Sequence, residues 1–221
     1  MATSTVENYV KRIFVEQPTA QRGLVSLGRL ARAMHVVPGT VTTMVKTLSE
    51  AGLAHYRPRQ GIRLTPAGEK LALRVLRRHR LIELFLVRVL GVDWAEVHPE
   101  AEELEHVISD KLLERIDQYL GRPAFDPHGD PIPSAAGKLS TSRVMRLIEC
   151  RTGQHVRIAR ISDQDDRFLR YANSHGLIPG AKVLLKQRDA LGDSILVRIA
   201  GRPPLSLGSA AGEKILVEAG N

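Results

Sequence analysis

The chain has 221 residues, 43% of them hydrophobic, which is enough for one large domain or for two to three small domains with their own cores. Its formal net charge is +8. The most apolar helical segment, residues 81–92, is twelve residues long and carries two charges, which excludes a membrane span. No charged segment followed by an apolar one opens the chain, so we expect a cytoplasmic protein without a membrane partner.

The charge is divided unevenly along the chain. Residues 1–75 contain 11 Lys and Arg against 4 Asp and Glu, whereas residues 76–120 contain 6 against 10. Residues 121–221 are basic again, with 15 against 10. A basic first third indicates a polyanionic partner, and an acidic middle that also carries histidines indicates a cation.

Apolar residues at helical spacing predict three helices in the first 52 residues. The first covers residues 5–17, and the second covers "SLGRLARAMH" with Ser26 as its N-cap. The turn "VVPGT" separates the second helix from the third, which ends at Gly52. Two helices joined by a short turn are typical of a helix-turn-helix.

The next segment, "LAHYRPRQGIRLTPAGE", predicts a β-hairpin followed by the start of a helix. Thr65 is the expected N-cap of that helix and Pro66 its first residue. A hairpin directly after a helix-turn-helix predicts a winged helix-turn-helix, with Arg57, Arg59 and Arg63 at the wing.

The sequence pattern after residue 65 changes twice along the chain. Helical patterns cover residues 66–90 and 99–120, and a segment rich in proline and glycine, residues 121–142, predicts a linker. Beyond it the hydrophobic period becomes two, which predicts the strands of a small β-barrel. The expected strands cover residues 155–161, 181–187, 194–200 and 214–219, with one short helix at 166–176.

In a helix-turn-helix the N-terminal residues of the second helix reach base edges in the major groove. These positions hold small or hydroxyl-bearing side chains here, without Arg, Asn or Gln for bidentate base contacts, so we expect much of the specificity to be indirect. The alternative is a winged helix that contacts another protein. The base-edge candidates are Pro38, Gly39, Thr40, Thr42, Thr43 and Lys46, and the phosphate candidates are Arg29, Arg32, Lys46, Arg57 and Arg59.

The segment "EAEELEHV", residues 100–107, concentrates four glutamates and one histidine in a basic protein. On a helix, Glu102, Glu105 and His106 share one face, because positions three and four apart are neighbours. Two carboxylates and an imidazole on one face suit a divalent cation, since manganese and iron(II) take oxygen ligands and accept added imidazole. The alternative is a solvated acidic face.

A second group of the same chemistry precedes the first. His79 and Glu83 are four positions apart in "RHRLIEL", and His98 could complete a second site with them. Single histidines on helices are more often structural than ligating. Two histidine–carboxylate pairs at helical spacing favour metal binding over that alternative.

Several motifs follow one another in a specific order: "VPGTVTTMVKTLSEAGL", "IRLTPAGEKLA", "RRHRLIELFL", "EAEELEHVIS" and "DPHGDPIP". This order resembles the diphtheria toxin repressor family, the iron- and manganese-responsive regulators, from the N-terminus to about residue 133. The C-terminal barrel resembles the family's SH3-like, FeoA-type domain. The resemblance implies an α+β chain with a winged helix-turn-helix at 1–75, a helical metal-binding and dimerisation domain at 76–142 with its linker from 121, and the barrel at 143–221.

The resemblance also implies two metal sites. In the family, one site is formed by the E-x-x-E-H helix and a residue of the first helix. A second site draws on the two histidines and the glutamate upstream, often helped by groups of the linker or barrel. The first site corresponds here to Glu102, Glu105, His106 and Asn8, the second to His79, Glu83 and His98, and the helping groups to Asp126, His128, Asp163, Gln164 and Asp165.

Three departures from the family's patterns bear on the metal. Iron-type members have sulfur ligands at the positions of Asn8 and Glu102, so this chain favours Mn(II), with Fe(II) as the alternative. Manganese-type members often have Asp where Asn8 stands, and some have Glu where Lys11 stands. Some members begin the P-H-G segment with Cys, where Asp126 stands here.

The resemblance implies a homodimer that represses metal-uptake genes when loaded with metal and binds a palindromic operator on double-stranded DNA. Asn8 belongs to the first helix, whereas the E-x-x-E-H ligands belong to the dimer-forming region. A shared metal would therefore bias the chain toward recognition helices spaced for two half-sites. Apolar residues in 81–90 and 107–120 exceed the need of a winged domain, so we expect a dimer interface rather than internal core alone.

Two other classes of function compete with this one. In a metal-dependent hydrolase, Glu and His around a metal would activate water. The chain lacks an H-E-x-x-H motif, a glycine-rich phosphate loop and a nucleophile elbow, so we expect no enzyme. The other class is an interaction module whose functional part is the barrel. Metal-dependent retention of DNA distinguishes a regulator from both.

Overall fold

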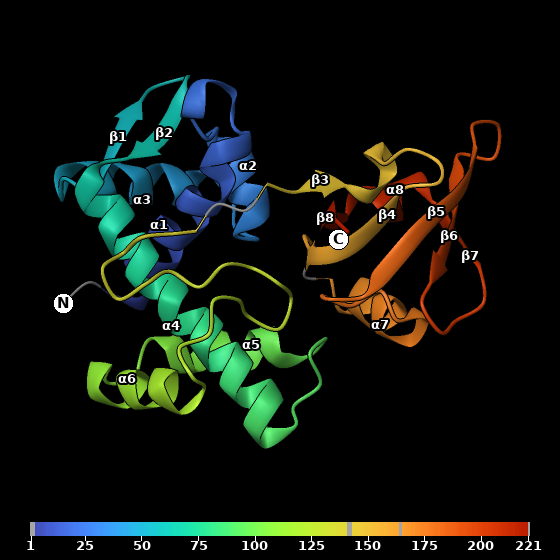
Figure 1. Cartoon of the computed structure of the whole chain (residues 1–221). Coiled ribbons are helices and arrows are strands. Elements are labelled where there is room, and N and C mark those ends of the chain that lie inside the picture. The colour runs from blue at the N-terminus through green and yellow to red at the C-terminus, as the bar shows by residue number, and fades with distance from the viewer. Residues whose placement is uncertain (1–2, 141–142, 164, 221) are drawn as a thin grey trace. The chain divides into compact units, whose positions relative to one another are not determined.

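The computed structural model describes residues 3–140, 143–163 and 165–220 (Figure 1). The chain divides into two compact units, and helices α4 (Pro66–Leu90) and α5 (Val97–Glu105) pass from one unit into the other. The first unit comprises Met1–His79, Glu105–Ile108 and Pro133–Leu139, and the second comprises Arg80–Leu104, Ser109–Ile132 and Ser140–Asn221.

The first unit contains the expected helix-turn-helix. It is formed by α1 (Ser4–Glu16), α2 (Leu27–Ala33) and α3 (Pro38–Glu50), with two short 3-10 turns, η1 (Gln17–Thr19) and η2 (Gln21–Gly23), before α2. The Ser26 hydroxyl accepts the backbone N–H of Arg29 and thereby caps α2 as predicted. Pro38 begins α3, where a missing N–H costs nothing.

The wing consists of the antiparallel strands β1 (Ala54–Arg57) and β2 (Gly61–Leu64). Ile62 also pairs with Val25, which ties the hairpin to the segment before α2. Gly61 is required at this point, because a Cβ there would lie 2.6 Å from the carbonyl oxygen of Val25. The hairpin therefore adopts a fixed position beside the helix-turn-helix.

Helix α4 begins as predicted, with the Thr65 hydroxyl accepting the N–H of Gly68 at 3.1 Å. The expected helix over residues 99–120 is instead two helices, α5 and α6 (Asp110–Tyr119). The physical reason is Ser109, whose hydroxyl caps the amide of Leu112 and starts a new helix. As a result, His106 lies just beyond the end of α5 rather than inside a helix.

The segment after α6 contains no helix among its described residues, as expected of a linker, yet residues 124–132 are held in a defined loop. Phe125 pairs with Pro131, and the backbone N–H of Asp126 donates to the carbonyl of Asp130 at 2.9 Å. The loop is therefore an ordered platform for its side chains.

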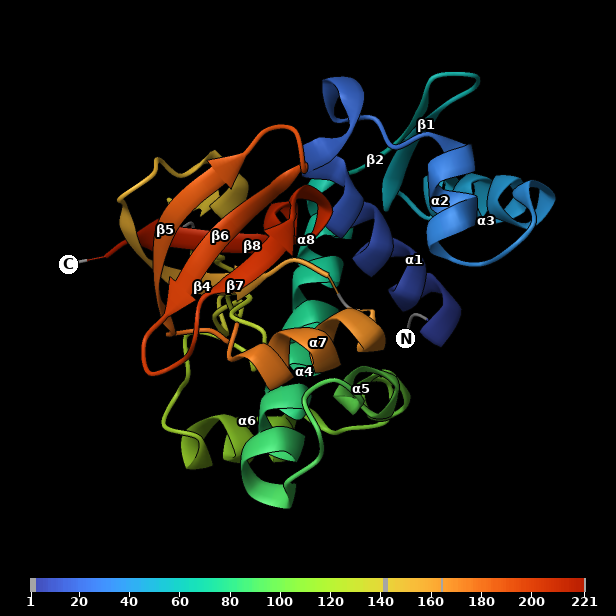
Figure 2. The same ribbon diagram turned by 90° about the vertical axis from the view of Figure 1, so that its right-hand side faces the viewer.

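The C-terminal part of the second unit is a six-stranded antiparallel sheet in the order β3-β8-β4-β5-β6-β7. Figure 2 shows the sheet curling, with helix α7 (Asp166–His175) at one end of its strands. The four predicted strands and the short helix are confirmed, whereas β3, β7 and the short helices η3 and α8 carried no clear pattern. The remaining bounds are β3 (Met145–Arg146), η3 (Leu147–Glu149), β4 (His155–Ile161), β5 (Lys182–Asp189), β6 (Ser194–Ile199), β7 (Leu205–Gly208), α8 (Ser209–Glu213) and β8 (Ile215–Ala219).

Each unit has its own apolar core. The core of the first unit joins the winged-helix elements through residues such as Ile13, Val45 and Ile62. The barrel core includes the single cysteine, Cys150, which is buried and free. Among the described residues, no helix combines the length and the apolar character that crossing a membrane requires.

The apolar residues expected at a dimer interface separate into two sets. Leu81, Leu84 and Leu113 are buried within the single chain and contribute to its core. Val107, in contrast, is 77% exposed, and Leu112, Val89 and Leu90 are exposed as well. Several large apolar side chains between residues 89 and 112 are therefore exposed in the single chain.

Candidate metal centres and DNA-binding surface

Glu105, the last residue of α5, is fully buried in the first unit and contacts three charged or ionisable side chains. Its Oε2 lies 2.6 Å from His79 Nδ1 on α4, and its Oε1 lies 2.6 Å from Lys11 Nζ on α1. His106 Nε2 is 3.4 Å from Oε1. Glu105 thus connects the first helix of the winged domain with α4 and with the residue that follows α5.

The pKa of Glu105 lies below its ordinary value. Burial alone raises that pKa, but the hydrogen bond and charge of His79, together with the charge of Lys11, outweigh it. The carboxylate is therefore ionised and can only accept, so His79 donates through Nδ1. In the neutral imidazole, Nε2 then keeps a lone pair, as a metal ligand requires.

His106 is held by the first helix. Its Nδ1 lies 2.7 Å from Glu7 Oε2, and its Nε2 lies 2.9 Å from Asn8 Oδ1. Arg78 is a further partner of Glu7, with Nη1 3.7 Å from Oε1. The predicted set Asn8, Glu105 and His106 is thus brought together, through pairwise contacts.

The fourth member of that predicted set, Glu102, contacts a different histidine. It is half-exposed and lies 3.6 Å from His98 Nε2, one turn earlier on α5. Within the structure it therefore belongs with the upstream group, although a helix places it on the same side as Glu105.

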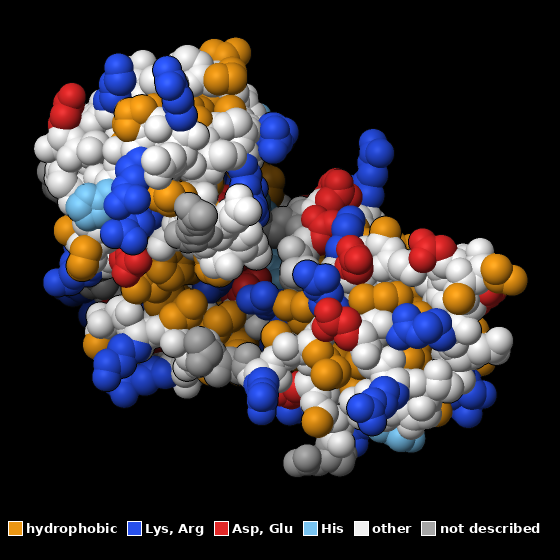
Figure 3. Space-filling view, turned by 90° about the horizontal axis from the view of Figure 1, so that it is seen from above, with side chains coloured by type: hydrophobic (Ala, Val, Ile, Leu, Met, Phe, Trp, Pro, Cys, Tyr) orange, Lys and Arg blue, Asp and Glu red, His pale blue; other side chains and the backbone are white. Residues whose placement is uncertain are grey.

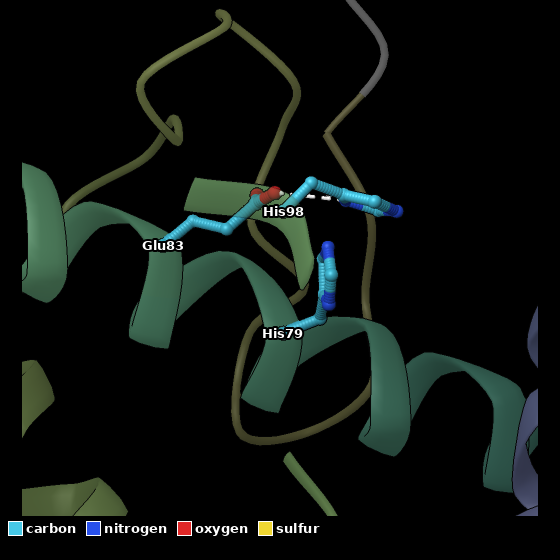
Figure 4. Close-up of side chains that lie close together, drawn as sticks. All are labelled: His79, Glu83 and His98. Carbon is cyan, nitrogen blue, oxygen red and sulfur yellow. Dashed lines mark hydrogen bonds and ion pairs between the residues drawn. The ribbon is translucent and has the colours of Figure 1, made fainter. Parts of the chain in front are cut away.

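The upstream group forms a compact cluster of potential ligands (Figure 4). His79 and Glu83 lie one turn apart on α4, and His98 Nδ1 is 3.2 Å from Glu83 Oε1. One ligand atom of each of the three residues lies within 4.8 Å of the others. Figure 4 shows the three side chains converging from α4 and the start of α5. The predicted triad is therefore assembled.

A second cluster extends from Glu83 to the ordered loop. Glu83, Asp126 and His128 are all buried, with one ligand atom of each within 4.8 Å of the others. His128 Nε2 donates to the carbonyl oxygen of Trp94 at 2.8 Å, and the two rings stack with centroids 5.3 Å apart. Because a carbonyl only accepts, Nε2 carries the proton, and in neutral imidazole Nδ1 remains available to a metal.

The ionised form of Asp126 is unfavourable in this cluster. Burial raises the pKa of its carboxyl well above the ordinary value, and the charges of Asp130 and Glu83 raise it further, with Arg80 offsetting only part. A cation between buried carboxylates relieves such repulsion. The donor set therefore fits a divalent ion.

The loop of the second cluster also fastens the barrel. Asp130 Oδ1 lies 3.0 Å from Arg160 Nη1 on β4 and 3.2 Å from Arg80 Nη2 on α4. The N–H of Ile161 donates to the carbonyl of His128 at 2.9 Å. A Cβ on Gly129, whose φ is +87°, would lie 2.0 Å from the carbonyl oxygen of Ala159, so only glycine permits this approach.

The residues of the barrel that were predicted as helping metal ligands make other contacts. Asp165 caps α7 by accepting the N–H of Phe168, and Asp163 forms an ion pair with Lys214. Neither belongs to the two ligand clusters found among the described residues. Gln164 lies outside the described residues.

The chemistry of the clusters restricts the metal. The assembled donors are carboxylate and amide oxygens and imidazole nitrogens, while the one thiol of the chain lies in the barrel core. Such donors suit manganese, iron(II) and related divalent ions rather than soft ions that select sulfur.

Helix α3 is the second helix of the helix-turn-helix, and the residues predicted to reach base edges lie at its N-terminus. Pro38, Gly39, Thr40, Thr43 and Lys46 are exposed and Thr42 is half-buried. The hydroxyls of Thr42 and Thr43 donate to the carbonyls of Pro38 and Gly39, at 3.0 and 3.3 Å. Their methyl groups and oxygen lone pairs therefore remain for contact with bases.

The predicted phosphate contacts fall into two kinds. Arg32, Arg57 and Arg59 are exposed, and Figure 3 shows Lys and Arg side chains spread over the face that carries β1 and β2. Arg29 instead forms an ion pair with Glu16 and donates from Nη2 to the Thr19 hydroxyl at 2.6 Å. Its guanidinium thus joins α2 to α1.

Sequence reasoning missed Glu7 and Trp94, which contact the predicted ligands His106 and His128, and it noted Lys11 as a departure from the family pattern without pairing it with Glu105. Glu7 and Lys11 lie one turn apart on α1, on either side of Asn8 and its neighbour Tyr9. Their helical spacing was a usable signal, because residues three and four positions apart share a face. Trp94 acts through its backbone carbonyl, for which no sequence signal exists.

Three family models match the chain. Residues 1–62 match the iron dependent repressor N-terminal DNA binding domain, and residues 65–134 match the iron dependent repressor metal binding and dimerisation domain. Residues 145–219 match the FeoA domain. The three matches follow the order of winged helix, central helices and barrel.

Relatives with established names span much or all of the chain. The iron-dependent repressor IdeR of Mycobacterium leprae is 28% identical, over 97% of this chain and 96% of its own length. The HTH-type transcriptional regulator MntR of Lysinibacillus sphaericus is 36% identical, over 52% of this chain and 81% of its own length. The solved structure of a manganese-dependent transcriptional repressor in complex with manganese is 40% identical, with a TM-score of 0.89 over 97% of this chain and 99% of that chain.

Proposed function

The chain belongs to the diphtheria toxin repressor family of metal-dependent, DNA-binding transcriptional repressors, and on that premise we propose that it is a homodimer that represses metal-uptake genes when loaded with Mn(II). It is a regulator and not an enzyme. We further propose that it acts in the cytoplasm on a palindromic operator. Its working parts are a DNA-binding domain at 1–75, a metal-binding and dimerisation domain at 76–142 and a barrel at 143–221.

One observation carries this proposal. Asn8 and Glu7 on α1 contact His106, while the buried carboxylate of Glu105 contacts both α1 and α4. A site built from these residues therefore includes the first helix of the DNA-binding domain. A change in the site is transmitted directly to the element on which the helix-turn-helix packs.

Two groups of residues would hold metal. We assign Asn8, Glu105 and His106 to one site, with Glu102 as a further donor from α5. We assign Glu83, Asp126 and His128 to a second site, with His79 and His98 beside it. A divalent ion, when bound, supplies positive charge that neutralises the clustered carboxylates. The chain itself orients the histidine ligands through hydrogen bonds. Glu105 orients the ring of His79, and Glu7 orients the ring of His106. The carbonyl oxygen of Trp94 orients the ring of His128.

The donor set supports Mn(II) over Fe(II). Glu102 and Asn8 provide oxygen where iron-type members have sulfur, and Asp126 provides oxygen where other members have Cys. Hard oxygen donors suit manganese, although iron(II) accepts the same imidazole and carboxylate ligands. The similarity to a manganese-dependent repressor complexed with manganese supports the same choice.

The DNA contacts follow from the exposed side chains of α3 and the wing. Thr40, Thr42 and Thr43 approach the bases, with Pro38, Gly39 and Lys46 beside them, and Arg32, Arg57 and Arg59 neutralise phosphates. The uncovered apolar side chains Val107 and Leu112 support a dimer, which a palindromic operator requires.

The test is retention of fragmented genomic DNA by the purified protein at fixed salt, in EDTA, in Mn(II) and in anaerobic Fe(II). We expect specific fragments to be retained with Mn(II), to be lost in EDTA, and to be lost in a Glu105→Ala/His106→Ala variant. Glu103→Ala is the matched control, because Glu103 is exposed on the same helix. Retention that is indifferent to metal would contradict the metal switch but not DNA binding, and stronger retention with Fe(II) than with Mn(II) would reassign the metal.

A further inference from the structure

Lys11 places an ammonium group inside the site assigned to metal. Its Nζ lies 2.6 Å from Glu105 Oε1, and its side chain is 11% exposed against 0% for that of Glu105. Lysine is rarely buried to this extent unless it is paired. The pair joins residues 94 positions apart in the sequence.

The ammonium occupies the oxygen that a metal would use. Glu105 Oε2 accepts the hydrogen bond of His79, so Oε1 is the oxygen directed toward α1 and His106. A divalent ion held by Glu105, His106 and Asn8 would draw on Oε1, the oxygen that Lys11 Nζ now contacts. An ammonium and a divalent cation on the same oxygen oppose each other, because like charges at contact distance repel strongly in a buried environment.

We propose that Lys11 is a built-in competitor of the metal, which holds Glu105 in the metal-free state and thereby sets the metal concentration at which the protein responds. The inference rests on the proposed function, since it concerns the same site. The lysine stem is long and flexible, which allows the ammonium to leave Glu105 for solvent when metal binds. In the metal-free protein the ammonium stabilises the buried carboxylate that would otherwise lack one of its partners.

Removing the positive charge of Lys11 should have different effects if the residue competes with the metal than if its role is purely structural. Lys11→Met keeps an apolar stem of similar length and deletes the ammonium. For a competitor, the metal-free protein becomes less stable while the affinity for metal rises. For a structural residue, both the stability and the affinity fall.

The experiment measures Mn(II) binding by equilibrium dialysis and thermal unfolding in EDTA, on the full chain. For Lys11→Met we expect the dissociation constant to fall about tenfold or more and the melting temperature in EDTA to fall by about 4 °C. The concentration of Mn(II) that gives half-maximal DNA retention should fall by the same factor. Lys11→Gln provides a second neutral variant if Lys11→Met does not fold.

Two controls separate the charge from the position. Lys11→Arg keeps a cation and should retain an affinity close to that of the wild type. Arg12→Met removes one positive charge from the same helix, at a residue paired with Glu16 rather than with Glu105, and should leave Mn(II) affinity unchanged. An affinity of Lys11→Met or Lys11→Gln equal to or weaker than that of the wild type overturns the proposal.

Failure of the broader function is distinguishable. A wild-type chain that binds Mn(II) without retaining DNA contradicts the proposed function, while the affinities of the variants still decide the role of Lys11. A wild-type chain that binds no Mn(II) overturns both.

Discussion

His79 Nδ1 donates to Glu105 Oε2 at 2.6 Å, and this single contact joins the middle of α4 to the end of α5 inside the first unit. It fixes the ring of His79, one ligand atom of which lies within 4.8 Å of ligand atoms of Glu83 and His98. Glu105 therefore affects both groups of ligands, one directly and one through His79.

Glu105→Gln should be among the most damaging single changes in the site. The amide keeps the shape of the side chain but leaves the Lys11 ammonium without its buried counter-charge. We expect the free energy of unfolding in EDTA to fall by about 3 kcal/mol and Mn(II) binding to be lost. Urea unfolding and equilibrium dialysis measure the two effects. Glu103→Gln, on the exposed side of the same helix, should change neither, and equal losses in both variants would contradict the role assigned to Glu105.

The pH dependence of stability should report the same carboxylate. The pKa of Glu105 is lower in the folded state than its ordinary value, so its ionised form stabilises the fold above the ordinary pKa range of glutamate. That contribution is lost as the pH falls through the lowered folded-state pKa. In metal-free protein, the stability difference between the wild type and Glu105→Gln should therefore be largest near neutrality and shrink in acid. A difference that does not vary with pH would rule out the electrostatic origin.

Asp126→Asn should separate stability from metal binding. The pKa of Asp126 is raised in the folded state, so its ionisation opposes folding, and this loss of stability develops as the pH rises above the ordinary range of aspartate. An Asn oxygen can still accept the N–H groups of His128 and Asp130, which Oδ1 now accepts at 2.9 Å each. We expect the variant to be at least as stable as the wild type in EDTA at neutral pH and to bind Mn(II) with lower stoichiometry or affinity. Calorimetric titration measures the binding of Mn(II), and thermal unfolding measures the stability. A variant that is less stable but binds Mn(II) as the wild type does would refute the assignment of Asp126 as a metal ligand.

The two kinds of arginine in the DNA-binding domain should behave differently. Removing exposed Arg57 by Arg57→Ala should weaken binding to all sequences and reduce the slope of log K against log salt by about 1. Arg29→Ala removes the contacts with Glu16 and Thr19, so its main effect should be on stability. Filter binding at several salt concentrations, with urea unfolding of both variants, provides the comparison. An unchanged salt slope for Arg57→Ala would exclude its phosphate contact.

Gly129 should be intolerant of any side chain. Gly129→Ala places a Cβ 2.0 Å from the Ala159 carbonyl and requires a left-handed φ, so we expect a loss of about 3 kcal/mol in the free energy of unfolding. Gly153 has a similar φ of +83°, but beyond its chain neighbours no described atom lies within 4 Å of the position that a Cβ would take. Gly153→Ala should therefore cost only about 1 kcal/mol. Urea unfolding compares the two, and similar losses would show that the barrel does not depend on this close approach.

Local sequence determined the elements and the chemistry of this protein. The caps at Ser26 and Thr65, the proline that begins α3 and the period of two in the barrel strands all act over a few residues, so their structural effect is visible in the sequence. The residue types at His79, Glu83, Glu105 and His106 likewise indicate a cation site through helical spacing alone.

Only the tertiary structure decided how those residues are partnered. Helix spacing places Glu102 near both Glu105 and His98, and the structure pairs it with His98. Tertiary packing alone directs Glu105 to His79 and Lys11. The strands β3 and β7 are two and four residues long and become strands through pairing with β8 and β6 rather than through a pattern of their own. The sequence places the cation of Lys11 one turn after Asn8, whereas its contact with Glu105, 94 positions away, was decided by the fold. Contacts between residues far apart in the chain depend on how complete helices and strands pack, and this packing has no local signature.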